Sequence, residues 1–252
     1  MPGSFQQAFD FSHKVVLITG GASGIGLAIA TQFVAQGARV ALVDISDEVE
    51  RVATSFGNGS AGWCGDVSDE ARTQAIVADV IARFGRIDVL VNNAGIGLIE
   101  KAEDMSAALW DQTMAINLRG PFLYTREVGR HMLERGTGRI VNMASQAALV
   151  GLDKHLAYSA SKAALLGMTR VLAGEWGPRG ITVNAISPTV VETELGRRAW
   201  AGEVGAQFKR KIPSGRFAQP DEIAFAALYL ASDAAAMING ENLVIDGGYT
   251  TQ

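Results

Sequence analysis

Short runs of consecutive apolar and β-branched residues recur along the chain, and segments of helix length separate them. Strands that are buried on both faces of a parallel sheet carry such continuous apolar runs, because neither face meets water. The alternation therefore predicts repeated βαβ units. The predicted strands are Val15–Thr19, Arg39–Asp44, Val89–Asn92, Arg139–Met143, Ile181–Ile186 and Leu243–Ile245, with a weaker strand just before Asp66.

Helices are predicted in the segments between these runs. The last of them starts at Pro220 and Asp221, which place a rigid residue and a carboxylate at the positive end of a helix. The fold class expected is α/β, a doubly wound parallel sheet of about seven strands with helices on both faces. The predicted helices are Gly24–Gln36, Glu70–Phe84, Leu109–Glu134, Tyr158–Trp176 and Asp221–Ala231.

The rhythm of strands and helices continues without a linker or a repeat, which predicts one domain over residues 1–252. The least regular stretch runs from Thr189 to Gln219, where several glycines and Pro213 break it into short helical pieces. Irregular segments of this length often cover a site. We expect a mobile substrate cap around residues 189–219.

Composition narrows the class of protein. Hydrophobic residues make up 48% and charged residues 19% of the chain, which suits a globular core and argues against disorder. The net charge is −4 and the 22 Lys and Arg are scattered, so we expect no nucleic-acid partner. The one cysteine, Cys64, favours a reducing compartment such as the cytoplasm. We read neither a targeting signal nor a membrane-spanning run.

A glycine-rich segment follows the first predicted strand and opens a helix, with Gly20, Gly24 and Gly26 as its key positions. A pyrophosphate needs backbone N–H donors at a helix start and a chain without Cβ atoms in its path. A plain tight turn is the alternative reading, but the position between the first strand and its helix favours a Rossmann-type dinucleotide site.

Asp44 ends the second predicted strand, at the spacing from the glycines where a carboxylate can accept hydrogen bonds from the adenosine ribose. A helix cap or a solvated loop residue is the alternative. A carboxylate there also repels a 2′-phosphate, and no Lys or Arg lies in Gly21–Ser23 or just after Asp44. The sequence predicts NAD rather than NADP as the cofactor.

Tyr158 and Lys162 are one helical turn apart, which places a phenol and an ammonium on one helix face. A phenol becomes a base near neutral pH only if a nearby positive charge stabilises its phenolate, and Lys162 can supply that charge. Alone, the pair is a weak pattern that an ordinary amphipathic helix would also show. Ser145 strengthens it, because it follows a predicted strand at the edge where open α/β sheets build their sites. Ser145 lacks the setting of a hydrolase nucleophile and reads as a hydrogen-bond donor, or as a cap.

These features together resemble the short-chain dehydrogenases/reductases, in the branch of about 250 residues. The resemblance covers practically the whole chain and adds five further motifs. They are Asp66-Val67, Asn92-Asn93-Ala94-Gly95, Asn117, Pro188 with Thr193, and Asp246-Gly247-Gly248.

The resemblance implies a role for each matching residue. Tyr158 would be the acid/base, Ser145 would orient the substrate oxygen, Lys162 would also bind the nicotinamide ribose, and Asn117 would hold a water in a proton relay. Asn93 and Asn117 are equally open to a structural reading. The cofactor-binding residues so implied are Gly20, Ser23, Gly24, Ile25, Gly26, Asp44, Asp66, Val67, Asn93, Ala94, Gly95, Tyr158, Lys162, Pro188, Val191 and Thr193.

One position departs from the family pattern. The family usually has glycine after the proline that follows the sixth strand, whereas this chain has Thr189, whose Cβ alters the backbone options beside the nicotinamide. The three histidines are too dispersed to predict a catalytic metal, so we expect none.

The segments from Ser187 to Gly196 and from Asn242 to Thr250 look like those of the family's polyol dehydrogenases, including enzymes of threitol, arabitol or galactitol. Polar side chains in loops could bind several hydroxyls, although each could instead be solvated, and His155 could cap the helix of Tyr158. These substrate candidates are Gln146, Asp153, His155 and Glu192.

We therefore expect an NAD-dependent dehydrogenase that interconverts a secondary alcohol and its ketone, and homotetramers of the kind common in the family. One rival is a reductase of ketoacyl or other bulky carbonyl groups, although Asp44 argues against the NADPH preference common in such enzymes. The other is a noncatalytic NAD-binding sensor or scaffold, for which Ser145, Tyr158 and Lys162 would have no chemical use.

Overall fold

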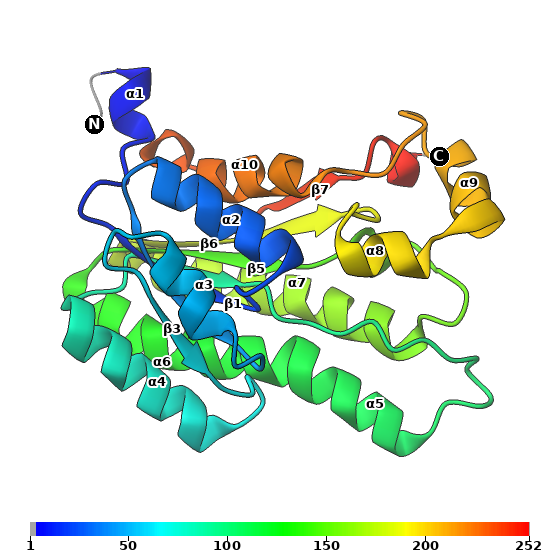
Figure 1. Ribbon diagram of the computed structural model, residues 1–252, viewed down its shortest axis with the longest axis horizontal. Helices are drawn as coiled ribbons and strands as arrows, with labels where there is room; N and C mark the ends of the chain where they lie inside the picture. Colours follow the sequence, from blue (N-terminus) through cyan, green and yellow to red (C-terminus); the bar gives the residue numbers. More distant parts are fainter. Residues whose placement is uncertain (1–3, 252) are drawn as a thin grey trace.

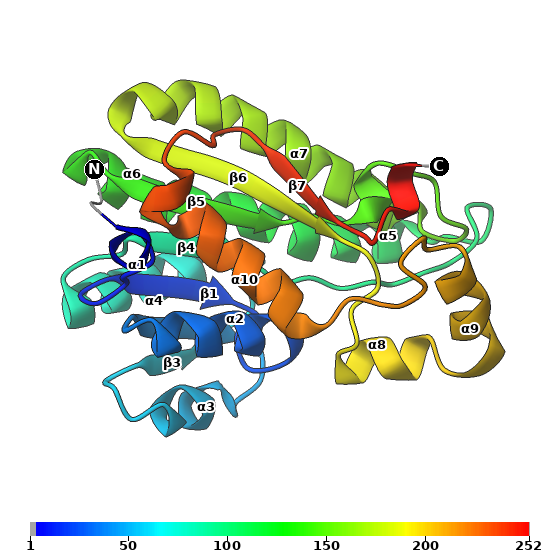
Figure 2. The same cartoon turned by 90° about the horizontal axis from the view of Figure 1, so that it is seen from above.

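Seven parallel strands form one sheet in the order β3-β2-β1-β4-β5-β6-β7 in the computed structural model, which describes residues 4–251 (Figures 1 and 2). The predicted α/β class and the predicted strands are confirmed, with ends that shift by one or two residues. The strands are β1 (Val15–Thr19), β2 (Arg39–Asp44), β3 (Ala61–Cys64), β4 (Val89–Asn92), β5 (Gly138–Met143), β6 (Ile181–Pro188) and β7 (Asn242–Ile245).

Helices cover both faces of this sheet. In Figure 1, α2 and α10 lie above it, and α4, α5, α6 and α7 lie below. The helices are α1 (Phe5–Ala8), α2 (Gly24–Ala35), α3 (Val49–Ser55), α4 (Glu70–Phe84), α5 (Ala107–Met114), α6 (Gly120–Arg135), α7 (Leu156–Trp176), α8 (Glu194–Ala199), α9 (Gly202–Arg210) and α10 (Pro220–Ala231).

Each face of the sheet has its own core. On one face, Ile29 and Phe33 of α2 and Ala227 of α10 pack on the strands. On the other, Val80 of α4 and Tyr124 of α6 do the same. Full burial of each large side chain stabilises the fold by about 1.5–3 kcal/mol. The two cores hold the strand ends in fixed positions.

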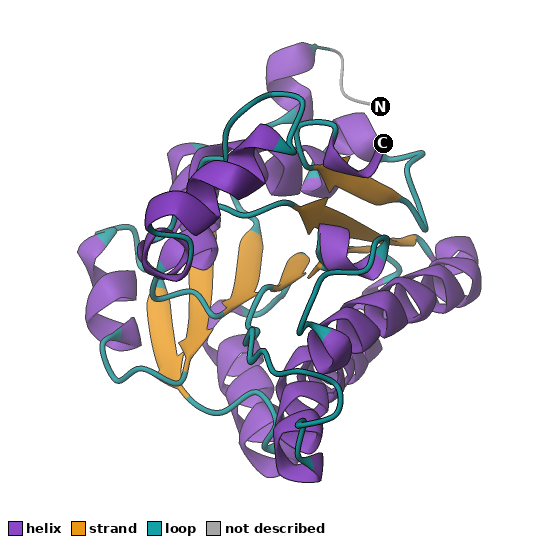
Figure 3. Cartoon of the chain, turned by 90° about the vertical axis from the view of Figure 1, so that its right-hand side faces the viewer, coloured by secondary structure: helices purple, strands orange, loops and turns teal. Residues whose placement is uncertain are grey.

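The strand order reverses beside β1, which pairs with β2 on one side and with β4 on the other. In open α/β sheets the crevice at such a point, outside the carboxyl ends of the strands, is where ligands bind. Figure 3 looks onto this end of the sheet, between the two layers of helices.

The predicted helix over Leu109–Glu134 is interrupted. A π-helical segment, Ala115–Arg119, joins α5 to α6, and the Gly120 N–H donates to the Ala115 carbonyl in place of an ordinary α-helical bond. Pro121 has no N–H to donate to the Asn117 carbonyl, so the regular α-helical pattern cannot continue through this point. π-turns of this kind are frequent at functional sites.

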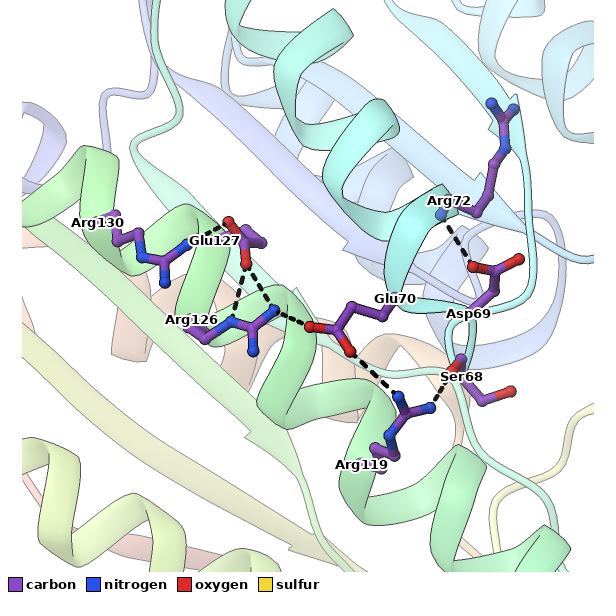
Figure 4. Close-up of polar contacts among 8 residues, drawn as sticks. All are labelled: Ser68, Asp69, Glu70, Arg72, Arg119, Arg126, Glu127 and Arg130. Carbon is purple, nitrogen blue, oxygen red and sulfur yellow. Dashed lines mark hydrogen bonds and ion pairs between the residues drawn. The ribbon is translucent and has the colours of Figure 1, made fainter.

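Charged side chains fasten α4 to the segment that joins α5 and α6 (Figure 4). Glu70 pairs with Arg126 at 2.7 Å and with Arg119 at 3.3 Å, and Arg119 also donates to the Ser68 carbonyl. The hydrogen bond from Arg126 is the main cause that lowers the pKa of Glu70. The network fixes the loop of residues 65–69 relative to the π-helical segment.

Residues 189–219 form the short helices α8 and α9, as the glycine spacing predicted, and both project beyond the carboxyl ends of the strands (Figures 1 and 2). Four aromatic rings pack where α9 meets the C-terminal segment, among them Phe208 stacked on Tyr249 with ring centroids 5.1 Å apart. The other two rings are Trp200 and Phe217. Within residues 4–251, none of the helices combines the length and the apolar character that crossing a bilayer requires.

Candidate active site

A cleft of about 570 Å³ opens at the carboxyl ends of β1, β2 and β4. Its walls contain most of the residues that the sequence assigned to the cofactor. Those that do not line it are Gly26, Tyr158, Lys162, Pro188 and Val191. The predicted residues in the walls are Gly20, Ser23, Gly24, Ile25, Asp44, Asp66, Val67, Asn93, Ala94, Gly95 and Thr193.

The glycine loop is shaped for close approach. A Cβ on Gly20 would lie 2.9 Å from the Ala94 Cα, and one on Gly26 would lie 2.0 Å from the Gly20 carbonyl oxygen, so neither position accepts a side chain. Ser23 is the N-cap of α2 without a side-chain capping bond, and it is exposed. Its hydroxyl and the first N–H groups of α2 are therefore available to a phosphate.

Asn93 braces this loop. Its side-chain amide donates to the Thr19 and Gly20 carbonyls, each at 3.0 Å, and the Thr19 hydroxyl accepts from the Asn93 and Ala94 N–H groups. These bonds tie the end of β4 to the turn after β1. They support the structural reading of Asn93, whose side chain holds the glycine loop in position.

Two aspartate carboxylates lie in the wall of the cleft. Asp44 accepts from the Ala22 N–H at 3.0 Å and from the Ser46 N–H at 3.1 Å, and one oxygen of Asp66 accepts from both the N–H and the hydroxyl of Ser68 at 2.8 Å. Ile45 lies beside them with 73% of its surface exposed. An exposed isoleucine in a cleft wall suits a flat apolar ring such as adenine.

The three predicted catalytic residues come from adjacent elements. Ser145 follows β5, and Tyr158 and Lys162 lie in the first turns of α7. The Ser145 side chain hydrogen-bonds Tyr158, which lowers the pKa of the phenol, but burial raises it more. The Lys162 ammonium donates to the Met143 carbonyl at 2.6 Å and lies 5.8 Å from the centre of the Tyr158 ring.

Burial lowers the pKa of Lys162 to about 8. The pKa of Tyr158 is raised in this arrangement, chiefly by burial, and the stabilisation of its phenolate by Lys162 stays a prediction. The Lys162 ammonium is directed at the Met143 carbonyl. Gly95 leaves the space between Lys162 and Asn117 free, because its missing Cβ would lie 3.4 Å from Nζ.

Asn117 lies on the π-helical segment and is fully buried. Its side chain accepts from the Ile96 N–H at 2.8 Å and donates to the Ile96 carbonyl at 2.9 Å and to the Ser161 hydroxyl at 3.2 Å. These bonds support the structural reading of the side chain. They leave the main-chain carbonyl, opposite Pro121, as the group that could hold a water.

The substrate candidates differ in their surroundings. Gln146 follows Ser145 and is 2% exposed, and its side-chain oxygen has no hydrogen-bond partner among the described residues. Glu192 pairs with Lys209 at 2.9 Å, so its carboxylate is already engaged. Asp153 is exposed, and its carbonyl lies 2.6 Å from Nδ1 of His155.

His155 stands at the N-cap position of α7, but its side chain makes no capping bond. His155 is therefore the N-cap residue of this helix, as the sequence suggested, but its imidazole does not cap the helix with a hydrogen bond. Its ring lies 5.9 Å from the Tyr158 ring, centre to centre. Thr189, at the departure from the family pattern, is 7% exposed and its hydroxyl has no partner among the described residues.

Sequence reasoning missed several residues of the cleft. Ile45 follows directly on Asp44, so an apolar residue after the acidic one was an available signal. Glu194 and Arg198 have the spacing of a helical ion pair, but nothing in the sequence placed that helix over the cleft. The other missed residues are Gly65, Ile96 and Ile116. No group of three or more His, Cys, Asp or Glu in the described part of the chain could hold a metal ion.

Comparison with known proteins agrees with this geometry. Residues 20–250 match the family model described as enoyl-(acyl carrier protein) reductase. D-threitol dehydrogenase of Mycolicibacterium smegmatis is 57% identical over 248 residues, covering 96% of this chain and 95% of that one. NAD-dependent glycerol dehydrogenase of Listeria innocua is 51% identical over 247 residues, covering 98% and 97%.

Solved structures resemble the fold over nearly its whole length. NAD⁺-bound xylitol dehydrogenase superimposes with a TM-score of 0.90 at 31% identity, covering 94% of this chain and 99% of that one. A structure described as a putative NAD(P)-dependent gluconate 5-dehydrogenase from Beutenbergia cavernae, with NADP bound at low occupancy, gives 0.92 at 36% identity and covers 97% and 100%.

Proposed function

The chain belongs to the short-chain dehydrogenase/reductase family, and from that premise we propose that it is an NAD-dependent polyol dehydrogenase. It interconverts a secondary alcohol, such as that of threitol, arabitol or galactitol, and the corresponding ketone. The observation that carries the proposal is the meeting of Ser145, Tyr158 and Lys162 beside a cleft shaped for a dinucleotide. The relatives named for threitol and glycerol support the substrate class.

The cofactor residues fit NAD. Gly20, Gly24 and Ser23 leave the start of α2 open to a pyrophosphate, and Asp44, which lines the same cleft, is the proposed partner of the adenosine ribose. A carboxylate there accepts hydrogen bonds from ribose hydroxyls and repels a 2′-phosphate. Pro188 and Val191 remain proposed contacts of the nicotinamide end.

Tyr158 is the proposed acid/base. Its phenolate takes the proton from the alcohol oxygen, and the Ser145 hydroxyl donates a hydrogen bond to that oxygen as it becomes a carbonyl. NAD, when bound, supplies the acceptor for the hydride that leaves the carbinol carbon. Lys162 holds a positive charge beside the phenolate and donates to ribose hydroxyls in place of its bond to the Met143 carbonyl.

The proton must then leave a closed site. Lys162 is 4% exposed and sits beside the space that Gly95 keeps free, next to Asn117. A water held by the Asn117 main-chain carbonyl would connect the lysine to solvent in the proposed relay. The residue therefore serves the proposed relay through its main chain while its side chain anchors the π-helical segment.

Gln146 is the substrate contact that the structure favours most. Its buried oxygen lacks a partner, and a buried acceptor of this kind discriminates against ligands that cannot donate to it. His155 is a second proposed contact, because its ring lies beside Tyr158. Glu192 reaches substrate only if its pair with Lys209 opens, so we give it a lesser part.

The assembly and setting are also proposals. Exposed apolar residues on α6 and α7, Phe122 and Val171, suit the faces through which a homotetramer would form. We propose one catalytic domain with a mobile cap over residues 189–219, in a cytoplasmic enzyme, because a chain with the one cysteine Cys64 suits a reducing compartment. Light scattering and cell fractionation measure the assembly and the compartment.

A substrate panel tests the function. Purified protein is mixed with NAD or NADP and with glycerol, four- to six-carbon polyols and simple secondary alcohols, and reduced cofactor is followed by absorbance. We expect NAD-linked oxidation of one polyol. Reduction of ketoacyl or bulky carbonyl substrates with silence on polyols would favour the carbonyl reductase, and silence in both directions would favour a noncatalytic sensor.

A further inference from the structure

Glu194 and Arg198 of α8 line the dinucleotide cleft, although the sequence analysis selected neither. Helix α8 lies beside the start of α2 in Figures 1 and 2, and a Cβ on Gly24 would be 3.3 Å from Cγ2 of Thr193, the residue that caps α8. Helix α8 therefore begins beside the glycine loop, and Glu194 and Arg198 line the same cleft as that loop.

The charges of the cleft are unbalanced. Asp44, Asp66 and Glu194 bring three carboxylates to its walls, and Arg198 is the one cation among the described residues that line it. A dinucleotide adds the two negative charges of its pyrophosphate. The amino end of α2 contributes only about half an elementary charge of the opposite sign. A cation at the pyrophosphate would offset part of this negative charge.

Arg198 is free to change partners. It is paired with Glu194 one turn earlier on the helix, and the two side chains are 77% and 73% exposed. An exposed ion pair of this kind adds little to stability, because water screens it and ordering two long side chains costs entropy. Two phosphate oxygens would offer the guanidinium a bidentate contact.

We propose that Arg198 leaves Glu194 and binds the pyrophosphate when the dinucleotide enters, so that α8 supplies the cationic side of the phosphate site. Glu194 then acts as a competing anion that weakens cofactor affinity. The proposal rests on the proposed function to the extent that it requires a dinucleotide in this cleft. If it is right, removing the charge of Arg198 weakens dinucleotide binding, and removing the charge of Glu194 strengthens it.

Binding of NADH, NADPH, ADP-ribose and adenosine to full-length R198Q, E194Q and R197Q tests it, by calorimetry without substrate. Arg197 is the matched control, because it lies on the same helix, donates to the Glu192 carbonyl at 2.8 Å and does not line the cleft. We expect R198Q to weaken NADH and ADP-ribose about tenfold. Adenosine, which has no phosphate, should bind R198Q as it binds the wild type.

E194Q should instead tighten NADH and ADP-ribose by about threefold, and both effects should shrink at about 1 M salt, where the Debye length is about 3 Å. R197Q should bind like the wild type. Weakening by E194Q, or equal weakening by R197Q and R198Q, would mean that the charges only support α8 and would overturn the proposal. Loss confined to NADPH would assign Arg198 to a 2′-phosphate instead.

The same titrations separate this proposal from the function itself. ADP-ribose carries the pyrophosphate but cannot accept a hydride, so its binding does not depend on turnover. A wild type that oxidises a polyol with NAD and an R198Q variant that binds ADP-ribose normally would refute the role of Arg198 alone. A wild type that binds none of the phosphorylated ligands would refute both.

Discussion

Lys162 carries a buried ammonium group at the candidate site. Its ammonium is 4% exposed and has one described hydrogen-bond acceptor, the Met143 carbonyl, and burial brings its pKa down to about 8 from an ordinary 10.5. The charged form is thus held against its solvation preference. Residues kept in costly states of this kind cluster at functional sites, and they often lower stability in return for function.

The variant Lys162→Met should therefore stabilise the cofactor-free protein at pH 7. The shift of the lysine pKa corresponds to about 3 kcal/mol, of which about 1–2 kcal/mol is returned as the lost bond to the Met143 carbonyl. We expect a net gain of about 1–2 kcal/mol in the free energy of unfolding, together with loss of activity. Urea unfolding at one protein concentration measures it.

The stability difference between Lys162→Met and the wild type should depend on pH. Between about pH 8 and 10.5 the unfolded wild type holds the Lys162 proton and the folded one releases it, so wild-type stability should rise with pH over that window relative to Lys162→Met. Because wild-type stability rises by about 1.4 kcal/mol per pH unit in this window, the advantage of the variant should vanish at about pH 9–9.5, and the wild type should be the more stable protein at about pH 10.5. A variant that is less stable than the wild type at pH 7 would show that burial of this charge is already compensated.

At the scale of elements, the contact between α6 and α7 depends on one missing side chain. A Cβ on Gly129 of α6 would lie 2.4 Å from Cη2 of Trp176 at the end of α7, whereas a Cβ on Gly174 of α7 would meet nothing within 4 Å. Both glycines lie in helices with ordinary negative φ. They form a matched pair that separates packing from helix propensity.

Gly129→Ala should lower the free energy of unfolding by about 1–3 kcal/mol, because the indole ring must shift. Gly174→Ala should raise it by up to about 1 kcal/mol, because alanine favours the helix and fills open space. Thermal unfolding of both variants measures the difference. Equal changes in the two would mean that α6 and α7 are not held by this contact.

The sequence predicted some helices and strands better than others. Apolar runs placed six of the strands, because strands buried on both faces leave an unbroken signal, whereas the half-buried β3 gave only a weak one. α1 and α3 escaped notice, since four and seven residues are too few to show a helical period. The π-helical segment at Asn117 was not predicted, although Pro121 marks a point where a regular helix cannot continue.

At the scale of the whole molecule, the site is built where segments far apart in sequence meet. Motifs could be read for Gly20, Asp44 and Tyr158, because each has a local context of strand end or helix turn. Arg198 and Ile45 could not be selected in this way. Their relevance depends on how α8 and the end of β2 face the cleft, which only the packed chain reveals.

The central claim is that Tyr158 serves as the acid/base of an NAD-linked polyol oxidation. The most direct measurement is the rate of NADH formation by Tyr158→Phe at saturating NAD and polyol, with NAD affinity measured on the same sample. The account predicts that turnover falls by about 10³-fold or more while affinity for NAD stays close to that of the wild type. Turnover retained in the variant would contradict the account.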